Sequence, residues 1–226
     1  VEHLVHHAPD TSISQRFDYT YDALGRRTGM TTLDGTTTYA YDSIGQLTGV
    51  VLPGGRTIQY QYDAAGNRIS ATDNGVVTAY TTNLLNQYTA VGAATKAYDL
   101  DGNLLSTTDP AGTTTYTYNA DNRLISSSDP AGTWNYEYDV LGDRVATVHD
   151  GVRTEYLVDP TGLGDVVAEY TGGGGLVARY TIGLGLTSRI DAAGAAAYYN
   201  FDALGSTAQL TGSNGAVLNI YSYLPF

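Results

Sequence analysis

Pairs of tyrosines two positions apart recur along the chain and predict β-strands. Residues i and i+2 project from the same face of a strand, so each pair would place two rings side by side on one face. Threonine is frequent around these pairs, and threonine and tyrosine both favour strands. The pairs are Tyr19/Tyr21, Tyr39/Tyr41, Tyr60/Tyr62, Tyr116/Tyr118 and Tyr136/Tyr138.

The second tyrosine of each pair belongs to a repeat. Tyr-Asp occurs at Tyr21-Asp22, Tyr41-Asp42, Tyr62-Asp63, Tyr98-Asp99 and Tyr138-Asp139, with degenerate copies at Tyr80, Tyr118-Asn119 and Tyr156. From Tyr21 to Tyr156 the spacings are 20, 21, 18, 18, 20, 20 and 18 residues. Such regularity is the signature of a repeat protein.

Each repeat contains two turns. The Asp after Tyr is suited to accept a hydrogen bond from the backbone N–H two residues later. A glycine then supplies a positive φ, at Gly25, Gly45, Gly66, Gly102, Gly142 and, after Asp202, at Gly205. The second turns are Asp34-Gly35, Gly54-Gly55, Asn74-Gly75, Asp109-Pro110-Ala111-Gly112, Asp129-Pro130-Ala131-Gly132 and Asp150-Gly151.

The pattern predicts an all-β fold without significant helix, a repetitive ribbon of antiparallel hairpins with about 20 residues each. The tyrosines would form ladders, with Leu47, Ile69, Leu105, Leu124 and Val145 facing the same way. We expect a flanking segment at 1–16, the repeats at 17–155, and C-terminal repeats at 156–226 that continue the same sheet. Stability would come from contacts between neighbouring repeats.

Composition excludes several classes of protein. The 226 residues are 42% hydrophobic and 11% aromatic, which argues against disorder. The net charge of −12 disfavours nucleic acid or an anionic membrane as partner, and no stretch is apolar enough to span a bilayer. Cysteine is absent, so disulfides and thiolate sites are excluded. The start lacks both an initiator Met and a signal peptide, which suggests a piece of a longer chain or a processed product.

Two groups of residues could hold a metal, but both have simpler interpretations. Asp99-Leu100-Asp101-Gly102-Asn103, with Asp109, partly matches a calcium loop, yet Asp99 is the repeat Asp and the twelve-residue loop is incomplete. His3, His6 and His7 could bind a metal if the segment were helical. We interpret them as part of a flanking strand, and we expect no metal and no cofactor.

No catalytic constellation is evident. Ser206-Thr207 and Gly183-Leu184-Gly185 lack the strand–loop–helix context of a nucleophile elbow or a phosphate loop. His149, beside Asp150-Gly151, is interpreted as a solvated turn residue. Gly172 to Gly175 is expected to be the turn of a hairpin between Tyr170 and Leu176, although a linker is an alternative. We therefore expect a non-enzymatic protein.

The repeat resembles the YD repeat of the Rhs family, which includes bacterial polymorphic-toxin shells, cocoon components of toxin complexes and teneurin shells. The resemblance is carried by Tyr21-Asp22-Ala23-Leu24-Gly25-Arg26-Arg27 and Tyr62-Asp63-Ala64-Ala65-Gly66-Asn67-Arg68. Tyr198 to Thr207, which contains Asp202-Ala203-Leu204-Gly205, and Tyr221 to Phe226 are similar to the Rhs-associated core segment. The resemblance implies part of a hollow shell, secreted or on the cell surface, that encloses a toxin polypeptide.

Three roles follow as hypotheses. The first is a structural segment of a shell that encloses or displays a polypeptide, continued by flanking YD repeats. The second is a subunit of an extracellular fibre, in which further copies pair through the unpaired strand edges. The third is a module that binds glycans or a receptor through its tyrosine-rich surface.

Overall fold

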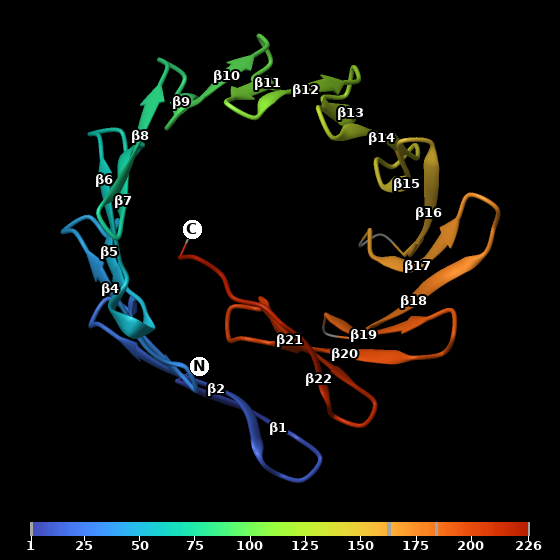
Figure 1. The fold of residues 1–226 in the computed structure, drawn as a ribbon, viewed down its shortest axis with the longest axis horizontal. Coiled ribbons are helices and arrows are strands. Elements are labelled where there is room, and N and C mark those ends of the chain that lie inside the picture. The colour runs from blue at the N-terminus through green and yellow to red at the C-terminus, as the bar shows by residue number, and fades with distance from the viewer. Residues whose placement is uncertain (1, 162–163, 184, 226) are drawn as a thin grey trace. The chain divides into compact units, whose positions relative to one another are not determined.

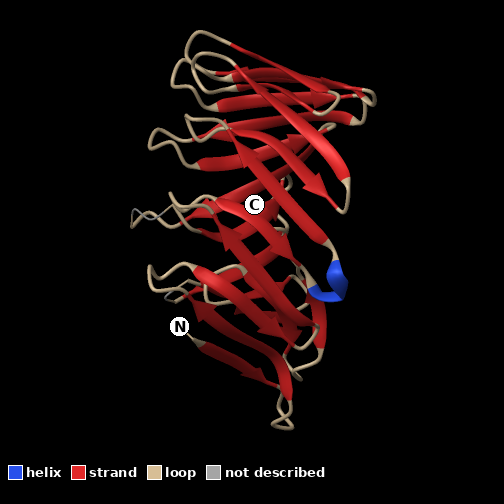
Figure 2. Cartoon of the chain, turned by 90° about the vertical axis from the view of Figure 1, so that its left-hand side faces the viewer, coloured by secondary structure: helices blue, strands red, loops and turns tan. Residues whose placement is uncertain are grey.

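The structure, a computed structural model, describes residues 2–161, 164–183 and 185–225. It confirms the all-β prediction, with 22 strands that form an antiparallel sheet of repeated hairpins (Figure 1). The helical content of the described residues is one 3-10 turn, η1 (Pro53–Gly55), blue in Figure 2. The described residues include no helix with the length and apolar character of a membrane-spanning segment.

The chain divides into two compact units, and each is described separately. Unit 1 comprises Val1–Gly92, Asn200–Leu210 and Asn214–Phe226, and unit 2 comprises Ala93–Tyr199 and Thr211–Ser213. The sequence-based segments 1–16, 17–155 and 156–226 are not tested by this division and stay a prediction.

The strands have the following bounds. The first nine lie in unit 1: β1 (His3–His7), β2 (Ile13–Tyr21), β3 (Arg27–Thr32), β4 (Gly35–Tyr41), β5 (Leu47–Val51), β6 (Thr57–Tyr62), β7 (Arg68–Asp73), β8 (Val76–Thr82) and β9 (Tyr88–Val91). The next are β10 (Ala94–Tyr98), β11 (Leu104–Asp109), β12 (Gly112–Tyr118), β13 (Leu124–Asp129), β14 (Gly132–Tyr138), β15 (Arg144–His149) and β16 (Val152–Val158). The last are β17 (Val166–Thr171), β18 (Leu176–Ile182), β19 (Leu186–Asp191), β20 (Ala196–Phe201), β21 (Thr207–Gly212) and β22 (Val217–Ile220).

A register shift recurs at the second tyrosine of the repeat. In the pairing of β4 with β5, Ala40 lies opposite Gly49 and Tyr41 opposite Leu47, so β5 carries one extra residue. The same irregularity immediately precedes Tyr62, Tyr118 and Tyr138. Because a β-bulge increases the local twist, its recurrence bends the strand where the Asp turn begins.

The Asp turn forms as the sequence predicts. In the repeat of Asp63, the carboxylate Oδ1 accepts hydrogen bonds from Ala65 N and Asn67 N, both at 2.9 Å. The backbone closes the turn, because Asp63 N donates to Asn67 O and Gly66 N donates to Asp63 O. Asn83 and Asn119 accept the same bonds in the degenerate repeats. An Asp or Asn side chain therefore caps two backbone donors in each such turn.

The turn needs glycine because the backbone adopts a positive φ there, and not because a side chain would clash. Gly25 has φ of 76°, and a Cβ atom there would meet nothing within 4 Å. Asn86 and Asn122 occupy the equivalent position in other repeats, with φ of 58° and 59°. We predict that Gly25→Asn changes the free energy of unfolding little, whereas Gly25→Val lowers it by about 1–2 kcal/mol more. Urea denaturation of both variants would check this, and equal effects would contradict it.

The core of unit 1 lies on the tyrosine face. Val50, Ile58 and Tyr60 form one buried cluster on β5 and β6. A second cluster joins Phe17 and Tyr19 of β2 to Ala208 of β21. The second cluster shows that β21 packs against the tyrosine face of β2, which local sequence pattern did not predict.

Candidate functional site

Arginines lie between the tyrosine rings. The guanidinium of Arg27 lies 4.5 Å from the ring centroid of Tyr39 and 5.7 Å from that of Tyr19. In unit 2, Arg144 lies 5.8 Å from Tyr136 and 5.6 Å from Tyr156. Cations over the ring face are attracted by the π electrons. The predicted tyrosine ladder is therefore a tyrosine–arginine face.

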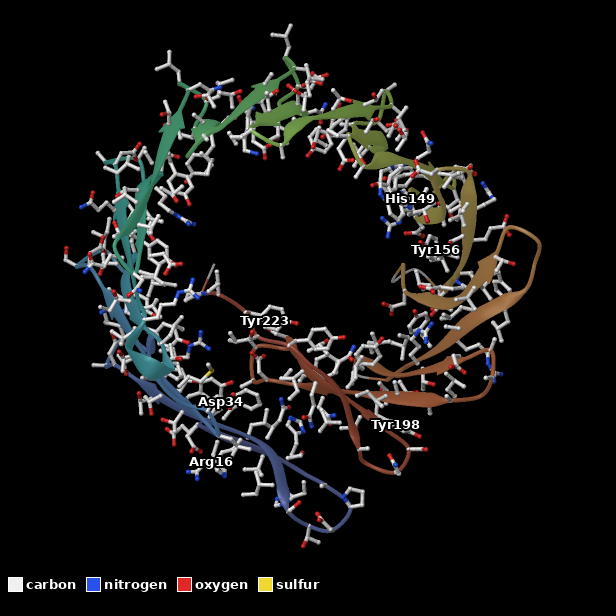
Figure 3. The ribbon with its side chains drawn as sticks, in the orientation of Figure 1. Arg16, Asp34, His149, Tyr156, Tyr198 and Tyr223 are labelled. Carbon is white, nitrogen blue, oxygen red and sulfur yellow. The ribbon has the colours of Figure 1, made fainter. Side chains whose placement is uncertain are left out.

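The two faces of the sheet differ in polarity. On β12, Tyr116 and Tyr118 are half-buried, whereas Thr115 and Thr117, which alternate with them, are exposed. The same alternation holds on β4, where Tyr39 and Tyr41 alternate with exposed threonine and alanine. Figure 3 shows Tyr156 on the inner side of the curve formed by its neighbouring strands in unit 2. One face thus presents aromatic rings and cations, and the other presents small polar side chains.

The repeat tyrosine links successive Asp turns through its hydroxyl. Tyr62 donates to the carbonyl oxygen of Leu47 at 2.7 Å, and Tyr138 donates to that of Leu124 at 2.8 Å. The hydroxyls of Tyr41 and Tyr118 donate the equivalent hydrogen bonds, to Arg27 O and Leu104 O respectively. The acceptor is in each case the first residue of the preceding strand. These bonds fasten each hairpin to its neighbour.

The hydroxyl of Tyr62 is expected to contribute measurably to stability. Tyr62→Phe keeps the ring and removes the 2.7 Å bond, so the free energy of unfolding should fall by about 0.5–1.5 kcal/mol. Tyr198→Phe is the control, because this ring is exposed. Urea denaturation followed by circular dichroism measures both. A loss no larger than that of the control would contradict the linking role.

The Asp turns are also joined to one another by side chains. Asn67 Nδ2 donates to Asp63 Oδ2 at 3.0 Å and to Asn86 Oδ1 at 2.9 Å. Asn103 repeats this arrangement with Asp99 and Asn122. The hydrogen bond from the Asn67 side chain, followed by that from its backbone N–H, lowers the pKa of Asp63 despite opposing desolvation. The hydrogen bonds of this turn therefore favour the ionised form of Asp63.

A groove of about 500 Å³ lies within unit 1, between the N-terminal hairpins and the C-terminal segment. Its lining includes Phe17, Arg27, Tyr39 and Asp202, and residues from Ile220 to Pro225 form one side. Tyr223, which Figure 3 labels, donates from its hydroxyl to Thr207 O at 2.8 Å. Burial raises the pKa of Tyr39, so its phenol stays protonated. The lining includes no His or Cys.

The candidate metal residues do not converge. Asp99 Oδ1 accepts from Asp101 N and Asn103 N, so its carboxylate caps the turn. His3 contacts Asp18, His6 bonds Phe201 O at 2.8 Å, and His7 bonds Thr11 O at 3.0 Å, each a different partner. No group of three metal-ligating side chains occurs within the described ranges.

His149 is partly solvated, as interpreted, with a side chain 42% exposed, but it is a strand residue and not a turn residue. It ends β15 just before the Asp150-Gly151 turn, and its ring stacks on Trp134 at 3.9 Å with an interplanar angle of 9°. The hairpin around Gly172 to Gly175 is confirmed, because β17 and β18 pair on either side of it. Ser206 donates its backbone N–H to Asp202 as another turn residue. Leu184 of Gly183-Leu184-Gly185 lies outside the described residues.

Comparison with protein families supports the repeat assignment. The RHS Repeat family matches residues 41–77, 98–133 and 118–155. Residues 41–77 and 98–155 of the chain are RHS repeats. The predicted repeat residues from Tyr41 to Gly66 and from Tyr98 to Gly142 lie within the matched ranges. The curated proteins include none that matches the chain.

One solved structure shares the fold of this chain at low sequence identity, and others resemble it more distantly. A Tc holotoxin pore from Photorhabdus luminescens, carrying a TccC3 mutation, matches with a TM-score of 0.57 and 15% identity, over 99% of this chain and 14% of that chain. TcdB2-TccC3 without its hypervariable C-terminal region matches with a TM-score of 0.48 and 16% identity, over 95% of this chain and 18% of that chain. The RHS-repeat chain thus spans less than a fifth of the length of these structures.

The arginines were missed by sequence reasoning although the RHS repeat signals them. Arg27, Arg68 and Arg144 each follow a repeat tyrosine by six residues. Arg68 lies over the rings of Tyr60 and Tyr80, at 5.0 and 5.1 Å. A cation at a fixed distance from a recurring ring would have indicated the stacking.

Proposed function

We propose that the chain is a non-catalytic wall segment of a larger RHS-repeat shell that encloses or displays a polypeptide. The observation that carries the proposal is the difference between the two faces of the sheet. Exposed threonines on one face suit contact with water, and tyrosines and arginines on the other suit contact with protein. The likeness of fold to a Tc holotoxin supports the same reading. We place the shell outside the cell or on its surface.

Further RHS repeats would continue the wall. Exposed aliphatic side chains lie at the tips of several of these turns, two residues after the turn Asp or Asn: Leu24, Ile44, Leu85, Leu141 and Leu204. Apolar side chains at turn tips are favourable where a neighbouring surface covers them. This supports lateral contact with flanking repeats of the same protein.

A fibre is the second candidate role. β1 pairs with β2 and, among the described residues, with no other strand, so one edge of the sheet is open in unit 1. Unpaired backbone groups at such an edge can pair with a strand of another copy. Light scattering that shows a concentration-independent monomer would count against this role.

Protease protection tests the enclosing role. The native protein, purified without denaturation, is digested with a protease. The polypeptide that the shell is proposed to enclose is prepared alone and digested in parallel. We expect the polypeptide to survive in the native protein, to be degraded when alone, and to become sensitive in the native protein once urea unfolds the repeats. Equal digestion rates in the folded protein and in isolation would contradict enclosure.

A further inference from the structure

The groove of unit 1 contains a cation whose hydrogen-bonding groups are unused. Arg27, the first residue of β3, is half-buried in the lining. Its guanidinium lies 4.5 Å from the ring centroid of Tyr39 and 5.7 Å from that of Tyr19. In the part of the chain that the structure describes, no acceptor bonds its N–H groups and no carboxylate pairs with it. A half-buried donor without an acceptor calls for a partner from outside the chain.

A carboxylate from the C-terminal side of the groove is only half used. Asp202 follows β20, and its Oδ1 accepts hydrogen bonds from Leu204 N at 2.8 Å and Ser206 N at 2.9 Å. In the turn of Asp63, the second carboxylate oxygen is bonded by the side chain of the fourth residue, Asn67. The fourth residue after Asp202 is the shorter Ser206, and among the described residues nothing donates to Asp202 Oδ2. One oxygen therefore holds the turn, and the other is available.

The hydroxyl of Tyr39 is affected by both charges. Burial raises the pKa of this phenol, the Arg27 guanidinium lowers it, and the Asp202 carboxylate raises it. Across the described ranges, Arg27 and Asp202 form no ion pair with each other, and the Tyr39 hydroxyl has no hydrogen-bond partner. A guanidinium, a phenol and a carboxylate oxygen with unused hydrogen-bonding capacity thus line one groove of about 500 Å³.

These three groups are complementary to a molecule that carries both charges. A guanidinium binds a carboxylate through two parallel hydrogen bonds, and a carboxylate oxygen accepts a charge-assisted bond from an ammonium group. The rings of Tyr19 and Tyr39 already hold the Arg27 guanidinium, so a ligand orders it at little cost in entropy. The charged residues of the lining balance, because Arg16 and Arg27 are matched by Asp34 and Asp202. A ligand without net charge is therefore favoured over an anion or a cation.

The groove also has an apolar part. Its lining includes Phe17, Met30, Leu52, Leu204 and Ile220. An apolar side chain on the ligand would be removed from water by contact with these residues. The volume lies within the range of about 300–1,000 Å³ that is usual for small-molecule sites.

We propose that Arg27, Tyr39 and Asp202 form a binding site for a free α-amino acid with an apolar side chain. The α-carboxylate accepts hydrogen bonds from Arg27 and the Tyr39 hydroxyl, and the α-ammonium group donates to Asp202 Oδ2. The apolar side chain contacts the apolar part of the lining. Figure 3 labels Asp34 and Tyr223, two further residues of this groove. The site requires no enclosed polypeptide and is therefore independent of the proposed function.

Three related ligands separate the two charges. Leucine carries both, N-acetyl-leucine lacks the ammonium group, and leucinamide lacks the carboxylate. Each is titrated into the full chain at constant ionic strength, and the NMR shifts of backbone and arginine Nε–H signals give the dissociation constants. We expect saturable binding of leucine and binding weaker by about tenfold for each analogue. Absence of leucine binding up to its solubility limit, or equal binding of the three ligands, would overturn the site.

Two variants assign each charge to its partner. Arg27→Gln should weaken binding of leucine by about tenfold and leave binding of leucinamide, which has no carboxylate, unchanged. Asp202→Asn should weaken binding of leucine by about tenfold and leave binding of N-acetyl-leucine unchanged. Asn83 caps its own turn with a neutral side chain, so we expect Asp202→Asn to fold. Leucine binding that is unchanged in both variants would refute the assignment.

Matched controls change the same residue types outside the groove. Arg56→Gln removes an arginine that pairs with Asp73, and Asp63→Asn alters another turn carboxylate. Both variants should bind leucine as the original protein does, and losses equal to those of Arg27→Gln and Asp202→Asn would contradict the site.

The three ligands still test the site on the original protein if Arg27→Gln does not fold. Tighter binding of the blocked peptide Gly-Glu-Lys-Gly than of leucine would assign the groove to a polypeptide and overturn our proposal. Because leucine is not a cargo polypeptide, failure of these titrations leaves the protease-protection test of enclosure unaffected.

Discussion

Replacing Ile58 with alanine should lower the free energy of unfolding by about 2–5 kcal/mol. Ile58 is 4% exposed and packs with Val50 and Tyr60 in a buried cluster that joins β5 to β6. Few side chains in this thin sheet are so completely buried, and neighbouring repeats stabilise one another through such contacts. Deleting the side chain leaves a cavity in the cluster between β5 and β6.

The matched control is Ile69→Ala. Ile69 is 43% exposed on β7, so its loss should cost less than about 1 kcal/mol. Urea denaturation followed by circular dichroism gives both values. Equal costs at the two positions would mean that the Val50–Ile58–Tyr60 cluster is not what stabilises unit 1.

Acid should destabilise the sheet through its turn carboxylates. The pKa values of Asp22, Asp42, Asp63 and Asp99 are all lowered from 3.8, with hydrogen bonds from the fourth residue after each Asp among the causes. A carboxyl whose pKa is lower in the folded state stabilises the fold fully above its unfolded value. That stabilisation is lost as the pH falls below 3.8 through the folded values. We expect the thermal midpoint to be nearly constant from pH 7 to about 5 and to fall steeply below about pH 4.

Asparagine substitution separates charge from turn geometry. Asn83 and Asn119 already cap their turns with a neutral side chain. A variant with Asp→Asn at positions 22, 42, 63 and 99 should therefore fold and lose much of its acid sensitivity. Thermal unfolding monitored between pH 7 and pH 2 provides the comparison. An unchanged acid transition in this variant would show that other groups control it.

The local structure of the repeat could be read from the sequence because each turn is determined by residues within five positions. Asp63 caps Ala65 and Asn67, and Gly66 takes the positive φ that the spacing predicts. Alternation likewise places Tyr60 and Tyr62 on one face. These features depend on hydrogen-bonding capacity and backbone preference, which residue type alone conveys.

Features that depend on distant residues were not predictable in this way. Ala208 packs against Phe17 and Tyr19 across almost the whole sequence, and no periodicity signals that contact. The stack of Trp134 on His149 depends on strand register, which the turn between them leaves open. The tyrosine–arginine face could have been predicted, because arginine follows the repeat tyrosine at a regular spacing. The prediction would have required treating arginine as a cation–π partner of the rings.

Electron microscopy of the native protein would show whether this chain is one segment of an RHS-repeat shell wall. We expect hollow particles of uniform size, with density for a polypeptide inside them. Continuous fibres with a regular axial repeat, or solid globules without a cavity, would contradict it.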